Sequence, residues 1–257
     1  MGLEGAQAQD TVIYKTLDTF SLQMKVIYPE NMDEGRKYPA MVFFFGGGWK
    51  KGDWNHFERQ ANYFAERGMV CFLPNYRVSS RNHTTPFESL KDAKSAIRFV
   101  RSHARQFHID PDKLVGGGGS AGGHLAAACA VIDGFNDEQD DLTISCQPNA
   151  LVLFNPVIDN GPGGYGYDRI GNRYKEFSPL HNLQAGAPPT IIFLGTNDKL
   201  IPVETMKYYK KVMEKVGSPC ELFLYEGQGH GFFNDTDYCQ KTLVEADLFL
   251  SSLGLIQ

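Results

Sequence analysis

Long apolar runs are missing from this sequence of 257 residues. The longest uninterrupted run covers residues 125–132, which is much shorter than the roughly 20 residues that a membrane-spanning helix needs. Basic clusters are missing as well, since 25 lysines and arginines are outnumbered by 30 aspartates and glutamates, giving a formal net charge of −5. The first absence argues against a membrane span, and the second argues against nucleic acid as a partner.

Cysteines are few and scattered, and none of them forms a C-x-x-C pair or a Cys/His cluster. The sequence therefore predicts no zinc or other metal site, and no motif calls for a cofactor. Three cysteines lie in apolar surroundings and are expected to pack as small core residues: Cys71, Cys129 and Cys220. Cys146 and Cys239 lie in polar surroundings, and a disulfide between them or another pair stays open at this stage.

The amino-terminal residues contain no hydrophobic segment of the leader type. Residues 6–10 nevertheless resemble what remains after cleavage at an A-x-A site. We expect residues 1–10 to be flexible. The sequence leaves a secreted or periplasmic location and a cytoplasmic one equally open, and it does not fix the oligomeric state.

Segments typical of strands and of helices alternate along the chain, which favours a mostly parallel sheet covered by helices on both faces. Neither an internal repeat nor a low-complexity linker interrupts the pattern, so we expect one domain over residues 1–257. Strands are expected at 11–17, 22–28, 40–45, 69–73, 113–115, 150–154, 190–194 and 221–225. Helices are expected at 57–67, 87–107, 121–132, 203–216 and 241–253. The irregular residues 159–187 are expected to border or cover a site.

The most informative motif is a serine within the glycine-rich run 116–123. Residues 118–122 fit G-x-S-x-G, in which the serine occupies a sharp turn between a strand and a helix. We expect the strand to end at Val115, the glycines to form the turn, and the helix to begin at Ala121. Because a serine hydroxyl is a weak nucleophile alone, Ser120 requires a base, an orienting acid and donors for an oxyanion.

Three consecutive glycines, residues 46–48, follow the third expected strand. Such a run lets main-chain N–H groups approach a ligand oxygen without side chains in the way. In acyl transfer these donors stabilise the oxyanion of the tetrahedral intermediate, and removing one typically costs about 3–4 kcal/mol. A triglycine alone is equally well a flexible loop. Its pairing with the later G-x-S-x-G motif favours the catalytic interpretation.

An acid and a histidine follow the last two parallel strands. Asp198 comes after the strand at 190–194, and His230 lies in a glycine-framed loop after the final strand. Alone, each would be a turn residue or a surface histidine. The order Ser120, Asp198, His230 is the order of the triad in α/β-hydrolases, and all three follow the carboxyl ends of strands. Their combination predicts a catalytic triad. His124, on the helix after the serine, is expected to pack near the site.

With these motifs, the chain resembles the α/β-hydrolase superfamily over nearly its whole length. The closer resemblance is to the esterase/lipase group related to hormone-sensitive lipase, especially compact bacterial acetyl- and feruloyl-esterase-like members. The resemblance implies an eight-stranded α/β-hydrolase fold with a minimal cap. It also implies Ser120 as nucleophile, His230 as base and Asp198 as orienting acid. The implied oxyanion donors are the main-chain N–H groups of Gly47, Gly48 and Ala121.

One position departs from that group, because the residue before the glycines is Phe45 where its members usually have histidine. A phenyl ring makes no hydrogen bond, so packing is expected to hold the loop. The resemblance implies a serine ester hydrolase that acts through an acyl-enzyme on short-chain acyl esters, with acetylated or feruloylated carbohydrate as one substrate class. Candidate substrate-binding residues are the aromatic Trp49, Tyr165 and Tyr167.

Two alternatives remain at this stage. The first is an arylformamidase-like amide hydrolase, whose histidine-glycine-glycine-x-tryptophan motif resembles residues 45–49. The second is a ligand-binding protein on a hydrolase scaffold without catalysis. Proteins of the second kind commonly lose a member of the triad, whereas this sequence keeps all three.

Overall fold

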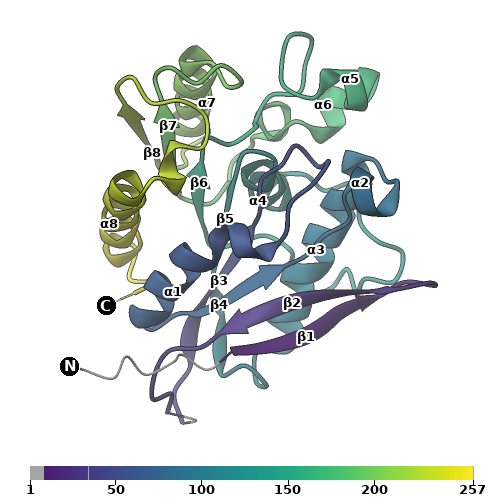
Figure 1. Cartoon of the computed structure of the whole chain (residues 1–257), viewed down its shortest axis with the longest axis vertical. Coiled ribbons are helices and arrows are strands. Elements are labelled where there is room, and N and C mark those ends of the chain that lie inside the picture. Colours follow the sequence, from purple (N-terminus) through teal and green to yellow (C-terminus); the bar gives the residue numbers. More distant parts are fainter. Residues whose placement is uncertain (1–8, 34, 257) are drawn as a thin grey trace.

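The computed structural model describes residues 9–33 and 35–256, and their strands form one sheet (Figure 1). The strand order is β1-β2-β4-β3-β5-β6-β7-β8. The strands are β1 (Gln9–Thr16), β2 (Ser21–Ile27), β3 (Tyr38–Phe44), β4 (Val70–Pro74), β5 (Ile109–Gly119), β6 (Ala150–Phe154), β7 (Thr190–Gly195) and β8 (Cys220–Tyr225). Strands β3 to β8 pair in parallel, while β1 and β2 join antiparallel at one edge. The expected eight strands and mostly parallel sheet are confirmed.

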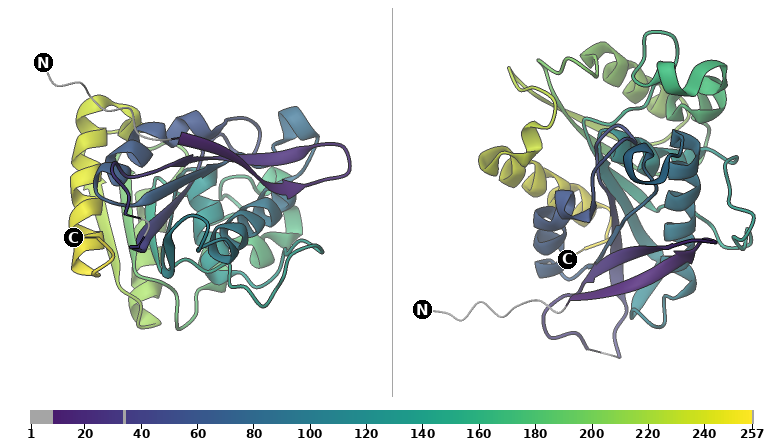
Figure 2. Two further views of the ribbon diagram at one scale, coloured as in Figure 1. Left: turned by 90° about the horizontal axis from the view of Figure 1, so that it is seen from below. Right: turned by 45° about the vertical axis from the view of Figure 1, so that its right-hand side comes forward.

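Helices cover both faces of the sheet, as the alternating pattern predicts. One face carries α1 (Glu58–Glu66) and α8 (Thr236–Ser252), and the other carries α3 (Pro86–Ser102), α4 (Ala121–Val131) and α7 (Val203–Lys215). Figure 2 shows this layering most clearly in its left view, where the yellow α8 and the teal helices lie on opposite sides of the sheet. Two apolar cores result, one on each face, and the sheet separates them.

The strand before Ser120 is longer than expected, because β5 runs through the glycines to Gly119. The prediction that these glycines form the turn was wrong. They lie in the middle of the sheet, where neighbouring groups leave no room for a side chain. A Cβ on Gly117 would lie 2.6 Å from the ring of Phe43, and one on Gly118 would lie 2.6 Å from the carbonyl oxygen of Phe44. Glycine is used here for close approach within a strand.

Two helix boundaries also differ from expectation. Helix α3 ends at Ser102 instead of continuing to residue 107, and the chain then turns toward β5. Helix α8 begins at Thr236 instead of residue 241, because the Asp235 side chain accepts a hydrogen bond from the N–H of Asp237 and caps it. Such a cap supplies a partner for an N–H group that has none within the helix.

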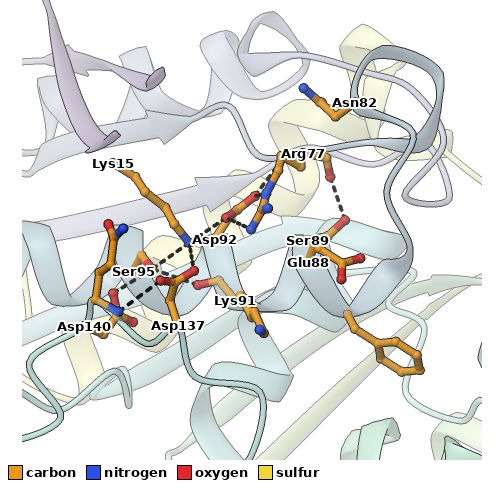
Figure 3. Close-up of polar contacts among 12 residues, drawn as sticks. Lys15, Arg77, Asn82, Glu88, Ser89, Lys91, Asp92, Ser95, Asp137 and Asp140 are labelled. Carbon is orange, nitrogen blue, oxygen red and sulfur yellow. Dashed lines mark hydrogen bonds and ion pairs between the residues drawn. The ribbon is translucent and has the colours of Figure 1, made fainter. Parts of the chain in front are cut away.

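The edge strand β1 is attached to α3 by a buried group of charges (Figure 3). Asp92 of α3 is fully shielded from solvent and accepts hydrogen bonds from Lys15 at 2.8 Å and from Arg77 at 2.8 Å through each of two guanidinium nitrogens. Lys15 also pairs with Asp137 at 2.7 Å. Removing one partner of such a buried pair leaves an uncompensated charge, which typically destabilises a protein by about 3–5 kcal/mol.

At the amino terminus, residues 1–8 of the segment expected to be flexible lie outside the described residues. Gln9 and Asp10 belong to β1 and pair with Ile27 and Val26, so the expectation of flexibility is wrong for these two. All five cysteines are free thiols, and Cys239 is buried despite its polar sequence neighbours. Within residues 9–33 and 35–256, no helix is long and apolar enough to cross a bilayer.

Candidate active site

Ser120 occupies a strained turn at the end of β5. Its φ of 54° and ψ of −119° lie where residues with a side chain are rare, and α4 begins at the next residue. The turn is held by its own main chain, since Ser120 donates to the Phe154 carbonyl at 2.9 Å and its carbonyl accepts from Val157 at 3.1 Å. Strain of this kind persists only where the surroundings fix it, and here it directs the Ser120 hydroxyl away from the sheet.

The structure brings Ser120, His230 and Asp198 together in one hydrogen-bonded chain. His230 Nε2 lies 2.9 Å from Ser120 Oγ, and His230 Nδ1 lies 2.7 Å from Asp198 Oδ2. The three come from loops after β5, β7 and β8, at the same edge of the sheet. This is the geometry that lets an imidazole accept a hydroxyl proton while a carboxylate fixes its orientation.

The Asp198 carboxylate is held in its ionised form. Its side chain is 0% exposed, and Oδ1 accepts from the N–H groups of Leu200 at 2.8 Å and Ile201 at 3.0 Å. Burial alone would raise the pKa of Asp198, but the hydrogen bonds from His230 and the two N–H groups outweigh it and hold that pKa below its ordinary value. An ionised carboxylate at this position stabilises the imidazolium that forms when His230 takes a proton.

The glycine loop lies beside Ser120 with two free N–H groups. Among the described residues, no hydrogen bond uses the N–H of Gly47, Gly48 or Ala121. The N–H of Gly46 is occupied, because His56 Nδ1 accepts from it at 3.0 Å. Gly48 requires glycine, since its φ is +65° and a Cβ would lie 2.6 Å from the Tyr165 hydroxyl. These positions are suited to bind an oxyanion next to the serine.

The Phe45 position, where the resemblance led us to expect histidine, is held by more than packing. The Phe45 ring stacks on Tyr76 with centroids 3.9 Å apart and planes 9° apart, as expected. In addition, the Tyr76 hydroxyl donates to the Phe45 carbonyl at 2.7 Å, so the prediction of packing alone was incomplete. The hydrogen bond from the Tyr76 hydroxyl to the Phe45 carbonyl and the one from the Gly46 N–H to His56 thus brace the start of the loop.

A cavity of about 420 Å³ opens over the serine. Its lining includes the loop glycines, Ser120 and His230, together with Tyr165 from the segment 159–187. The other two aromatic candidates lie elsewhere. Trp49 is 1% exposed and packs under the loop against His124 and Phe177. Tyr167 contacts Tyr174 instead of the cavity. Of the three, the structure brings Tyr165 alone to the cavity wall.

Comparison with known proteins gives the family. The sequence pattern of the BD-FAE family matches residues 24–162, which is more than half of the chain. The chain belongs to this family. The pattern of the dienelactone hydrolase family matches residues 163–247. With its eight-stranded sheet, the chain is an α/β-hydrolase of the esterase/lipase group. Members of this group are serine hydrolases of carboxylic esters.

Solved structures of one esterase resemble this α/β-hydrolase over almost its whole length. Esterase 2 of Thermogutta terrifontis phosphoramylated by tabun is 42% identical, with 96% of each chain covered and a TM-score of 0.92. The butyrate-bound structure of this esterase is 41% identical, with 96% of this chain and 95% of that chain covered and a TM-score of 0.91. Among curated proteins, an acetylxylan esterase of Xylanibacter ruminicola is 29% identical over 232 residues, 84% of this chain. The chain spans 44% of that relative's length.

Sequence reasoning missed three residues of this α/β-hydrolase site. His56 lies in a short 3-10 helix (Trp54–Phe57) and supports Gly46 from ten residues away. Asn155, directly after β6, is fully buried; its Nδ2 lies 3.4 Å from His230 Nε2, and its Oδ1 accepts from Gly231 at 3.3 Å. Arg169 donates to the Gly48 carbonyl from the segment 159–187. The position of Asn155 after a parallel strand is the one signal that could have indicated a site residue.

His124 packs beside the site of the α/β-hydrolase, as its place in the sequence predicts, and its main-chain N–H donates to the Ser120 carbonyl at 3.0 Å. It is fully buried, and its Nε2 lies 2.9 Å from the Phe177 carbonyl. Burial lowers the pKa of His124 to about 3 although the Phe177 carbonyl and Asn160 favour the charged form. The ring is therefore neutral at physiological pH and acts as a packing surface for Trp49.

A larger cavity, of about 530 Å³, lies away from the triad and is lined by residues that include Lys94, Arg98 and Cys146. Lys94 is fully buried and donates to the carbonyls of Ile132 and Gly134, while Arg98 pairs with Asp140 at 2.7 Å. The cations in its wall already have partners. The smaller cavity over Ser120 is the one that combines a nucleophile with a base, so chemistry and not size selects it.

Proposed function

We propose that this chain hydrolyses carboxylic esters of short acyl groups through an acyl-enzyme on Ser120. The observation that carries the proposal is the hydrogen-bonded chain from Ser120 through His230 to Asp198 at the floor of a cavity. The Ser120 hydroxyl lies next to an imidazole nitrogen of His230, and the ionised Asp198 carboxylate lies on the other side of the ring.

The reaction follows from this geometry in two halves. As Ser120 Oγ attacks the ester carbonyl, its proton passes to His230 Nε2, and the N–H groups of Gly47, Gly48 and Ala121 stabilise the oxyanion. The imidazolium then gives this proton to the departing alkoxide, and the acyl group stays on Ser120. In the second half, water gives a proton to His230 and attacks the acyl-enzyme. Breakdown of that intermediate returns the proton to Ser120 and releases the acid.

The size of the acyl group is proposed from the cavity and from the relatives. The similar Thermogutta esterase binds butyrate, which is a product of ester hydrolysis at a short acyl chain. Tabun phosphoramylates the same esterase, and such agents react with activated nucleophiles. We therefore propose acyl groups of about two to four carbons. Acetylated carbohydrate is the proposed natural class, by similarity to the acetylxylan esterase.

The alcohol part of the substrate is proposed to leave toward the mouth of the cavity. Lys50 and Lys51 are exposed and line it there, beside the glycine loop. Within the segment 159–187, Tyr165 reaches the cavity, and we propose that this segment borders the site as a minimal cap. A wall of this kind leaves room for a large carbohydrate outside the acyl pocket.

The test compares p-nitrophenyl acetate, butyrate, octanoate and dodecanoate with acetyl-xylan, methyl ferulate and N-formylkynurenine. The expected result is the highest kcat/KM for acetate or butyrate, and a loss of about 10⁴-fold or more in kcat for Ser120→Ala. Ser252→Ala, at the end of α8, is the matched control and should retain full activity. Undiminished ester hydrolysis by Ser120→Ala would disprove the assignment. A preference for N-formylkynurenine would favour the amidase alternative, and absence of labelling by a fluorophosphonate probe would favour a non-catalytic protein.

A further inference from the structure

The Tyr165 hydroxyl faces the oxyanion side of the cavity without a partner. Tyr165 is half-buried and lines the same cavity as Ser120 and His230. Its hydroxyl lies so close to Gly48 that a Cβ on that glycine would be 2.6 Å from the oxygen. Within residues 9–33 and 35–256, no hydrogen bond to this hydroxyl is formed. A polar group of this kind is free to bond a ligand.

The position of the Tyr165 side chain is fixed from several directions. Its ring packs at 5.1 Å from the Arg169 guanidinium carbon and at 6.1 Å from the Trp49 ring. Its carbonyl accepts a hydrogen bond at 2.9 Å from Asn160, which is fully buried. A hydroxyl on a ring held in this way loses little conformational freedom when it binds a ligand, so its orientation is prepared in advance.

Arg169 connects this tyrosine to the glycine loop. Its guanidinium donates to the Gly48 carbonyl, and its carbon lies 5.4 Å from the Trp49 ring centre and 5.1 Å from that of Tyr165. The Gly48 carbonyl is therefore bound by the same residue that packs against the Tyr165 ring. The N–H of Gly48 remains unpaired, and Gly48 itself lines the cavity.

We propose that the Tyr165 hydroxyl is a further catalytic group, which donates a hydrogen bond to the ester carbonyl oxygen as it becomes an oxyanion. It acts beside the N–H groups of the glycine loop. This inference rests on the ester hydrolysis proposed above and adds a side-chain donor to it. Because the bond strengthens as charge develops on the oxygen, its loss lowers kcat while KM stays nearly constant.

The experiment measures kcat and KM for p-nitrophenyl butyrate with the whole chain and with Tyr165→Phe, which removes the oxygen and keeps the ring. The expected result is a fall of about 10- to 100-fold in kcat, with KM within about twofold. Tyr208→Phe, on the exposed side of α7, is the matched control and should behave as the unchanged protein. The melting temperature of each variant verifies that it is folded.

Each other outcome has a defined meaning. An unchanged kcat in folded Tyr165→Phe overturns the inference, and so does a rise in KM with kcat unchanged, since that marks ordinary substrate binding. Arg169→Met is a second variant that keeps the Tyr165 hydroxyl but removes the guanidinium, and kcat should fall by less than in Tyr165→Phe. The failure of the proposed function itself would look different, because the unchanged protein would then hydrolyse no ester and Ser120 would resist the fluorophosphonate probe.

Discussion

His56 Nδ1 accepts a hydrogen bond from the main-chain nitrogen of Gly46 at 3.0 Å. Through this contact, His56, which follows the glycine loop in the sequence, holds the first peptide group of the loop in place. Burial lowers the pKa of His56, against the opposing effects of Asn234 and Asp53, so the ring is neutral and its Nδ1 can accept. A histidine thus supports the loop even though Phe45 occupies the position directly before the glycines.

Replacing His56 should slow turnover without removing the nucleophile. In His56→Leu the Gly46 N–H loses its acceptor and the loop is less well oriented, so we expect kcat for p-nitrophenyl butyrate to fall by about tenfold. His56→Gln supplies an amide oxygen as acceptor and should recover part of the rate. Equal rates in the two variants would show that the hydrogen bond is irrelevant to the loop.

Replacing the acid should disable the base. Asp198→Asn keeps the shape of the side chain but removes the charge that stabilises the His230 imidazolium, and it also favours the wrong tautomer of the ring. We expect kcat to fall by about 10³- to 10⁴-fold. Asp168→Asn, on an exposed carboxylate outside the triad, is the control. A loss of less than tenfold in folded Asp198→Asn would remove Asp198 from the triad.

Adding a methyl group at Gly48 should lower activity by more than its effect on stability explains. Gly48→Ala places a Cβ against the Tyr165 hydroxyl at a φ of +65°, so it disturbs both the loop and the tyrosine. Gly254→Ala is the matched control, because its φ is +67° and nothing lies within 4 Å of a Cβ there. Both should lose about 1 kcal/mol of stability from backbone strain, measured by urea unfolding. Only Gly48→Ala should lose activity, and equal activity in the two variants would contradict the close contact.

Stability should fall as the pH drops below about 6.5, because the buried His124 and the half-buried His56 gain a proton on unfolding. The pKa of His124 is lowered to about 3 and that of His56 is also lowered, so the unfolded chain binds more protons in this range. Their contribution is complete above the unfolded-state value of about 6.5 and declines below it. His124 alone should contribute about 2 kcal/mol less at pH 5 than at pH 7.

The measurement is the free energy of urea unfolding at pH 5 and at pH 7 for the unchanged protein and for His124→Gln. The variant is expected to be less stable at pH 7 but to have a smaller difference between the two pH values. The exposed His83 gives the control, since His83→Gln should leave the pH dependence unaltered. The same pH dependence in all three proteins would exclude His124 as its source.

The triad could be predicted from sequence because each member lies in the loop after a parallel strand, and the chain order of Ser120, Asp198 and His230 excludes most other interpretations. The end of β5 could not be predicted from sequence, because glycines locally favour turns. Only the rings and carbonyls of neighbouring strands explain why glycines occupy this strand. Tyr165 was predicted as one of three aromatic residues. Its selection over Trp49 and Tyr167 depends on packing between segments more than 100 residues apart, which no local pattern records.

Arg77, which pairs with the buried Asp92, is covalently bonded to Tyr76, the residue that contacts the start of the glycine loop. Arg77 is anchored through two guanidinium nitrogens to a carboxylate that solvent does not reach, and its neighbour Tyr76 holds the carbonyl of Phe45. A disturbance among these charges can therefore reach the glycine loop through the backbone of Tyr76 and the hydrogen bond from its hydroxyl to the Phe45 carbonyl. The rate of ester hydrolysis, like the stability of the fold, is therefore expected to depend on these charges, although the substrate does not contact them.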